Sequence, residues 1–256
     1  MQSRVQILAR SSREGGNVNP GVMTSWLSVR LWLPAILSTT AGAVDVIGFL
    51  VFGGLFTAHI TGNLVVVAAH YITGGFGQIG PIWAVPVFIA VLGAVVLLFG
   101  GIKSKSKSRR ALPVIHAALL AGCLGFGLRF GPFRSSDSPA AVLAGMLAVA
   151  ATATQNARRT LALVESPSTA VMTPNTTQLI VDLAALVRNA KEPDKLGKVR
   201  RSARVTFVCM AGFVGGCVAG AVFELRFGVG ALVLPVILAV AAVALGEQKG
   251  RIYEQF

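Results

Sequence analysis

Long apolar stretches separated by short polar breaks run through the chain from residue 31 onward. The breaks contain glycine, proline and charged residues, which are typical of turns and loops. Several stretches reach the roughly 20 residues that an α-helix needs to cross a bilayer core. Strand-like alternation is absent, and a backbone in lipid must satisfy its own hydrogen bonds, so crossing segments are expected to be helices. The pattern predicts an all-α fold, a polytopic membrane helix bundle, from eight apolar stretches: 31–56, 57–74, 81–102, 111–129, 139–160, 168–187, 203–224 and 228–246.

The positions of the 23 lysines and arginines indicate how many stretches cross the membrane. If all eight cross and the N-terminus is cytoplasmic, 15 of these cations lie inside and 8 outside. If 57–74 and 168–187 instead enter and return on the same side, only Arg129, Arg134 and Arg226 lie outside, a split of 20 to 3. Cytoplasmic loops carry an excess of Lys and Arg. The sequence therefore favours about six spanning helices, two re-entrant segments and two cytoplasmic termini, with full crossing by the two segments left as the alternative.

This topology implies an inverted repeat. Each half, about 31–129 and 139–247, would hold three spans, so the second half would be inserted upside down relative to the first. Secondary transporters often have such repeats, with a binding site near the midplane where broken elements meet. The halves would form one membrane domain over 31–247, preceded by a basic cytoplasmic tail at 1–30 and followed by a short cytoplasmic tail at 248–256.

Asp45 is the one formally charged residue between Arg30 and Lys103. A carboxylate near the centre of a spanning helix costs about 3 kcal/mol to insert, so it normally faces a partner or a wet cavity. As a functional residue, Asp45 would bind a proton, a cation or a polar solute. As a structural residue, it would pair with His59 or with a backbone donor. We favour the functional role as the working hypothesis.

Each re-entrant segment contains a short polar motif, T-G-N at residues 61–63 and T-P-N at residues 173–175. Glycine and proline interrupt regular helix, and threonine and asparagine supply hydrogen bonds where the backbone is interrupted. The motifs are either caps of the following helices or groups that bind a solute, and a helix N-terminus that faces a cavity can do both. The candidate binding residues in them are Thr61, Gly62, Asn63, Thr173 and Asn175.

Gln155 and Asn156 are adjacent amides in a helix otherwise made of Ala, Val, Leu and Thr. A buried amide without a partner costs roughly 1–3 kcal/mol, so both need partners. Hydrogen bonds between helices and contact with a solute are both open. His59 could exchange protons with Asp45, although a histidine in an apolar helix is more often a packing residue.

Three glycines recur every four residues late in the chain, at Gly212, Gly216 and Gly220. Glycines at this spacing share one helix face and let a second helix backbone approach closely. The pattern predicts tight packing, either within the bundle or between the protomers of a homo-oligomer.

Composition excludes several other classes of protein. The net charge of +13 comes without a zinc, recognition-helix or aromatic-interleaved basic motif, so nucleic acid is not an expected partner. Only 13% of residues are charged, against about a quarter in soluble domains. No catalytic or nucleotide-binding fingerprint is present, so an enzyme, a cofactor and a metal site are not expected. The cysteines have no paired spacing and are expected to be packing residues: Cys123, Cys209 and Cys217.

The segments G-A-V-D-V-I-G-F, F-T-A-H-I-T-G-N-L, T-Q-N-A-R-R and T-A-V-M-T resemble the YoaK-like family of bacterial membrane proteins. That family has no assigned function and is described as having about six membrane helices. The resemblance covers about residues 31–246 and implies a bacterial inner-membrane location. Two departures are Ile60, where methionine is common, and Pro174, where glycine is frequent. By motif match, the family's characteristic positions are Asp45, Thr61, Gly62, Asn63, Gln155, Asn156 and Thr173.

Two functions follow from these patterns. The first is a small secondary permease that moves a small polar or anionic solute across the bilayer, coupled to protons through Asp45. The second is a non-transporting membrane scaffold or accessory subunit, whose polar residues only stabilise the fold. The substrate, the coupling ion and the direction of movement are open at this level.

Overall fold

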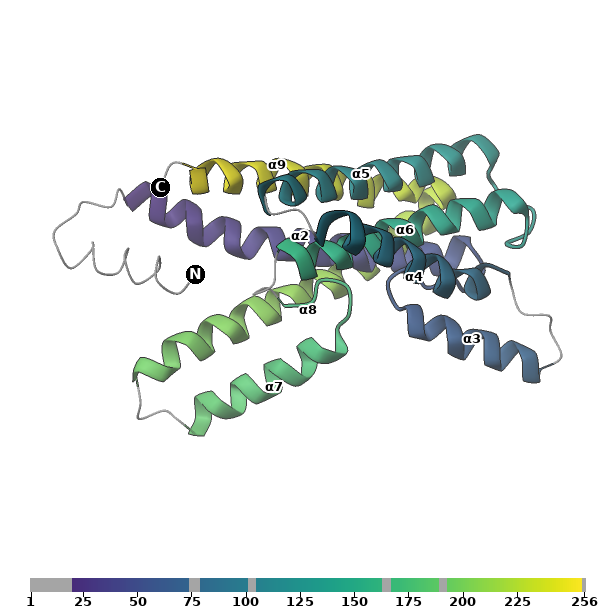
Figure 1. Ribbon diagram of the computed structural model, residues 1–256. Helices are drawn as coiled ribbons and strands as arrows, with labels where there is room; N and C mark the ends of the chain where they lie inside the picture. Colours follow the sequence, from purple (N-terminus) through teal and green to yellow (C-terminus); the bar gives the residue numbers. More distant parts are fainter. Residues whose placement is uncertain (1–19, 74–78, 101–104, 163–166, 189–192, 255–256) are drawn as a thin grey trace.

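The computed structural model describes residues 20–73, 79–100, 105–162, 167–188 and 193–254, and these residues are helical apart from short connections (Figure 1). Most of the predicted tail at 1–30 lies outside the described residues, but residues 20–30 belong to the first helix. The elements are α2 (Pro20–Val51), α3 (Ile60–Ile72), α4 (Ile79–Gly100), α5 (Lys105–Phe130), α6 (Pro139–Ala162), α7 (Thr173–Arg188), α8 (Pro193–Phe227), the 3-10 helix η1 (Gly228–Leu232) and α9 (Val233–Glu254).

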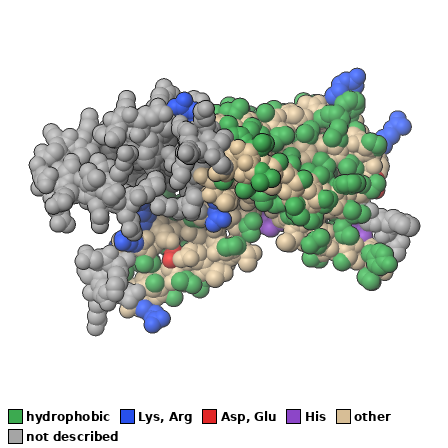
Figure 2. All heavy atoms as spheres, viewed as in Figure 1, with side chains coloured by type: hydrophobic (Ala, Val, Ile, Leu, Met, Phe, Trp, Pro, Cys, Tyr) green, Lys and Arg blue, Asp and Glu red, His purple; other side chains and the backbone are tan. Residues whose placement is uncertain are grey.

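Five segments are long and apolar enough to cross a membrane. The last of them, Leu196–Gly246, contains most of α8, all of η1 and most of α9. The other four are Leu31–Val51, Ile79–Gly100, Arg110–Phe130 and Pro139–Leu161. These segments and the helical fold of the described residues confirm the prediction of an all-helical membrane protein. On the face that Figure 2 shows, hydrophobic side chains are spread over the described surface, and several lysines and arginines lie toward its edges.

The long helices α2, α4, α5, α6, α8 and α9 run lengthwise in one bundle, in which α2 begins and α9 finishes at the same end (Figure 1). The short helices α3 and α7 begin near the middle of the bundle and run toward opposite ends (Figure 1). With 13 and 16 residues, they are about 20 and 24 Å long, shorter than a hydrocarbon core of about 30 Å.

The loop before α3 shows why the apolar stretch 31–56 does not stay helical to its end. Gly53 and Gly54 have φ angles of 66° and 76°, a left-handed conformation that glycine adopts without steric cost. This turn ends α2 at Val51 and sends the chain back toward the middle of the bundle (Figure 1).

The three glycines on α8 pack against α2 of the same chain. A Cβ atom built on Gly216 would lie 2.1 Å from the carbonyl oxygen of Thr39, and one on Gly212 would lie 2.8 Å from that of Ala35. Gly42 of α2 faces back toward α8, since a Cβ there would lie 2.1 Å from the carbonyl oxygen of Phe213. Of the two alternatives, packing within the bundle and contact between protomers, the structure shows the first. α2 therefore covers the face of α8 that carries Gly212, Gly216 and Gly220, and the formation of a homo-oligomer stays a prediction.

The main core lies between α2, α5, α6 and α9. Its buried side chains include large ones, such as Ile47 and Phe52, and small ones, such as Ala144 and Ala148. Outside this core, large apolar side chains such as Leu97 and Ile237 are exposed, as expected where a helix faces lipid. The core holds the middle of α2 and α6 in place, and both helices carry predicted site residues.

Candidate functional site

The chain between α2 and α3 forms a compact tip, defined here as residues 56–63 and called the first tip. The Asn63 side chain closes it, with Oδ1 accepting from the Phe56 N–H at 2.9 Å and Nδ2 donating to the Phe56 carbonyl at 2.7 Å. Asn63 lies in the first turn of α3 and is fully buried. The asparagine of T-G-N therefore uses its amide to hold the loop.

The chain between α6 and α7 forms a second tip, residues 168–175, with the same internal bonding. Asn175 Oδ1 accepts from the Ser168 N–H at 3.1 Å, and Nδ2 donates to the Ser168 carbonyl at 2.6 Å. In both tips the bonded residues are seven apart. The shared pattern is longer than T-x-N, because T-A-H-I-T-G-N at 57–63 matches T-A-V-M-T-P-N at 169–175 in four of seven places.

Asp45 anchors the first tip from the middle of α2. Its Oδ1 accepts hydrogen bonds from the N–H groups of Thr57 and Ala58, both at 2.7 Å, and from the Thr57 hydroxyl at 3.3 Å. Its Oδ2 lies 2.6 Å from Nδ1 of His59. Asp45 is 5% exposed. The pairing with His59 and backbone donors, which the sequence analysis weighed as the structural role, is what the structure shows.

His59 is the more accessible partner of this pair. Its side chain is 35% exposed, against 6% for that of Asp45. The ring packs edge-on against Phe213 of α8 at 5.4 Å and against Phe56 at 6.2 Å between centroids. A carboxylate only accepts hydrogen bonds, so Nδ1 carries the proton that lies toward Asp45 and Nε2 is left for another partner.

Gln155 has a corresponding role at the second tip. Its Nε2 donates to the Thr169 hydroxyl at 2.9 Å and to the Leu37 carbonyl of α2 at 3.0 Å. Its Oε1 is buried and has no hydrogen-bond partner among the described residues. Asn156 differs, because its Nδ2 donates to the Thr152 carbonyl one turn earlier in the same helix, at 3.0 Å. Of the two adjacent amides, Gln155 holds the tip.

The two tips meet in the middle of the bundle. Ala58 of the first tip and Ala170 of the second share one buried cluster with Ala41 of α2, against which Phe213 packs. The Thr152 hydroxyl of α6 donates to the carbonyl of Thr57, which joins the first tip to the second half of the chain. The structure thus brings the two predicted motifs together.

The nine predicted residues divide by exposure. Thr61 and Thr173 are exposed at equivalent places in the tips, while Asn63, Gln155 and Asn175 are buried. Gly62 lies against Phe56, since a Cβ there would be 3.0 Å from its ring. The sequence analysis missed Thr57 and Thr169, the residues that Asp45 and Gln155 bind. The repeated T-A pair before each T-x-N was the signal for them.

The profile of a family described as "Protein of unknown function (DUF1275)" matches residues 33–245. The chain belongs to this family. The DUF1275 match covers both tips and all the candidate spanning segments, apart from the outermost residues of the first and the last. It agrees with the resemblance to a membrane-protein family without an assigned function. No curated protein and no solved structure matches the chain.

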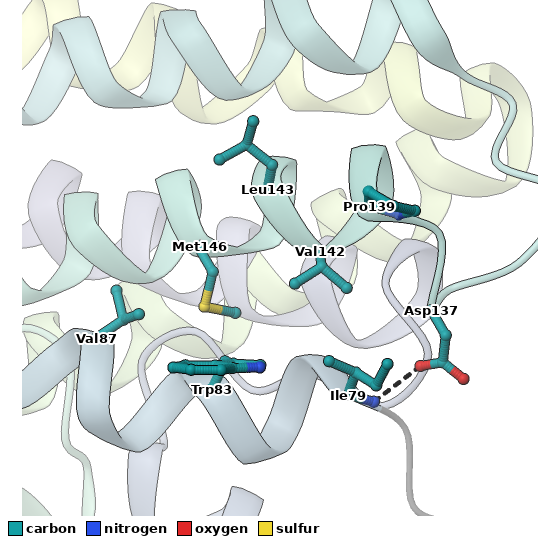
Figure 3. Close-up of a pocket in the computed structure, with 8 residues that line it drawn as sticks. All are labelled: Ile79, Trp83, Val87, Asp137, Pro139, Val142, Leu143 and Met146. Carbon is teal, nitrogen blue, oxygen red and sulfur yellow. Dashed lines mark hydrogen bonds between the residues drawn. The ribbon is translucent and has the colours of Figure 1, made fainter.

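A groove of about 380 Å³ in this DUF1275 chain lies between α4 and the start of α6 (Figure 3). Trp83, Val142 and Met146 line it, and most of its wall is apolar. Asp137 at its rim accepts a hydrogen bond from the Ile79 N–H at 2.8 Å and so caps α4. The groove contains none of the predicted site residues and opens on the apolar outer surface.

Metal-ligating side chains do not cluster in the described part of the chain, where no group of three or more His, Cys, Asp or Glu could hold an ion. Cys123 and Cys209 are buried, and Cys217 is half-buried. The accessible polar groups of the tips are instead the hydroxyls of Thr61 and Thr173 and the imidazole of His59, which suit hydrogen bonding to a small polar group.

Proposed function

We propose that the protein is a small secondary permease that moves a small polar or anionic solute through a site at the two tips. The observation that carries this proposal is that the two tips, each closed by an asparagine amide, share one buried cluster through Ala58 and Ala170. Broken elements that meet between two halves of a bundle are where secondary transporters bind their substrates.

The proposed topology has six spanning helices and two re-entrant segments that contain α3 and α7. Two observations support it: α3 and α7 are too short to cross, and they run from the middle toward opposite ends (Figure 1). Opposite directions are what an inverted repeat of halves 31–129 and 139–247 requires. The split of 20 to 3 cations supports cytoplasmic termini in an inner membrane.

The polarity of α7 supports a wet middle. Its half nearest the tips exposes Thr173, Thr177 and Gln178, whereas its far half exposes Leu183 and Val187. A half-helix that faced only lipid would be most apolar at the membrane centre, where water is scarcest. The reversed order fits a polar pathway that reaches the tips.

Transport by purified protein in proteoliposomes tests the proposal, with a panel of small labelled anions and neutral polar solutes. Asp45→Asn keeps the acceptor Oδ1 for the tip but removes the charge beside His59, and it is expected to abolish uptake while the protein stays folded. Asp137→Asn is the matched control, because that carboxylate caps α4 away from the tips. Full uptake by Asp45→Asn, or no uptake of any solute by the wild type, would refute the permease.

The second candidate is a membrane scaffold or accessory subunit. The observation in its favour is that Asn63, Asn175 and Asp45 all bind groups of their own chain. Purification in mild detergent separates the two functions. A second polypeptide at a fixed ratio, together with no solute that raises the thermal stability, would favour the scaffold.

A further inference from the structure

In the Asp45–His59 pair at the first tip, Asp45 is buried and His59 is accessible. Asp45 directs both carboxylate oxygens at its own chain, with three donors on Oδ1 and His59 on Oδ2. A solute that bound Asp45 would have to displace at least one of these bonds and open the tip. Asp45 is therefore a positioning residue.

His59 has the opposite character. Bonding of Nδ1 to Asp45 and the edge contacts with Phe56 and Phe213 fix the plane of its ring. About a third of the side chain is exposed, and among the described residues the ring bonds through Nδ1, which leaves Nε2 open. An oriented imidazole with one open nitrogen is a group that can contact a solute.

The surroundings of His59 favour a negatively charged solute once the ring is protonated. The Asp45 charge is balanced by two backbone N–H groups and the imidazolium itself. His59 also precedes α3, whose N-terminus carries a partial positive charge, and its side chain makes no capping bond to that helix. On the helices that pack against the His59 ring, the titratable groups close to it are its partner Asp45, on α2, and Cys217, on α8.

We propose that Nε2 of His59 is the solute-contacting group of the site, that Asp45 holds it in position, and that the protonated ring takes a small anion. This inference rests on the proposed function for the identity of the site and adds the class of solute. Anion and proton then bind together, so the affinity for the anion falls about tenfold for each unit of pH above the pKa of the ring.

Binding of acetate to purified protein tests the inference, with acetamide as a neutral probe of similar shape. At about pH 5.5, acetate is expected to bind and acetamide is not, and at about pH 8.5 acetate binding is expected to be lost. His59→Gln should weaken acetate binding by about tenfold or more, the usual effect of losing a hydrogen bond to a charged group. His70→Gln is the matched control on the same α3, because His70 bonds to the Val66 carbonyl.

A direct measurement needs no variant. The chain contains three histidines, so magnetic resonance of isotope-labelled histidine can follow each ring separately. Acetate should shift the His59 signals and raise its titration midpoint, and acetamide should do neither. Equal binding of both probes, unchanged acetate binding by His59→Gln, or shifts confined to His70 or His116 would overturn the inference. Acetate binding without transport of any solute would refute the permease and leave the anion site standing.

Discussion

Replacing Asn63 by alanine tests whether the side-chain amide is what holds the first tip. The substitution removes the acceptor for the Phe56 N–H and the donor to the Phe56 carbonyl. A backbone group left without a partner at a buried place costs about 1–3 kcal/mol, and two such groups lie at this position. Because Phe56 is only half-buried, we expect a loss of about 2–4 kcal/mol in the free energy of unfolding.

The same reasoning applies to the second tip. Asn175→Ala removes two bonds to Ser168, which is buried, so its loss should equal or exceed that of Asn63→Ala. Asn156→Ala is the control, since this amide makes one bond within its own helix and its removal should cost about 1 kcal/mol or less.

Equilibrium unfolding in mixed micelles, with increasing anionic detergent and circular dichroism as the signal, measures these differences. Because Ala58 and Ala170 belong to one buried cluster, the double variant of Asn63 and Asn175 should depart from additivity by at least about 0.5 kcal/mol. Losses below about 1 kcal/mol for both single variants, or a loss for Asn156→Ala as large as theirs, would refute the claim that the amides hold the tips.

Two further predictions concern the bundle and the topology. Gly216→Ala should destabilise the protein by about 1–3 kcal/mol, because its Cβ would overlap the Thr39 carbonyl. Gly215→Ala should be neutral or stabilising, since nothing lies within 4 Å of a Cβ there. The same unfolding assay compares the two variants, and equal effects would contradict the packing of α8 on α2. In a variant without native cysteines, a membrane-impermeant maleimide should label Thr73→Cys, at the end of α3, from outside intact cells. It should label Arg188→Cys, at the end of α7, only in inverted vesicles. Labelling of either position from the other side would mean that the corresponding segment crosses the membrane.

Much of the helical architecture could be predicted from apolar runs and cations alone. The stretch 81–102 became α4 within two residues at each end, because the requirement to span a bilayer dominates there. The stretch 57–74 was predicted less accurately, since its first three residues precede α3, which begins at Ile60. Hydropathy does not separate an apolar loop from an apolar helix when both contain Thr, Ala and Ile.

The sequence predicted which residues matter at the tips better than it predicted the hydrogen bonds that they make. The sequence identified Asp45, Asn63 and Gln155 as unusual, but two of their main partners are backbone groups of Phe56 and Thr57. Backbone groups have no sequence signal, because every residue carries them. The role of Asp45 therefore changed from an expected solute ligand to the anchor of a loop, and the accessible group proved to be its neighbour in the pair.

The bonds around the tips also imply an order of assembly during synthesis. The bonds that Asp45 and Asn63 make to the first tip join residues at most 14 apart, so they can form as soon as α3 has entered the membrane, and the bond from Thr152 to Thr57 is added later. The second tip is different, since Gln155 must reach Leu37, 118 residues earlier in the chain. Part of the hydrogen bonding at the second tip is therefore supplied by α2, a helix of the first half of the chain.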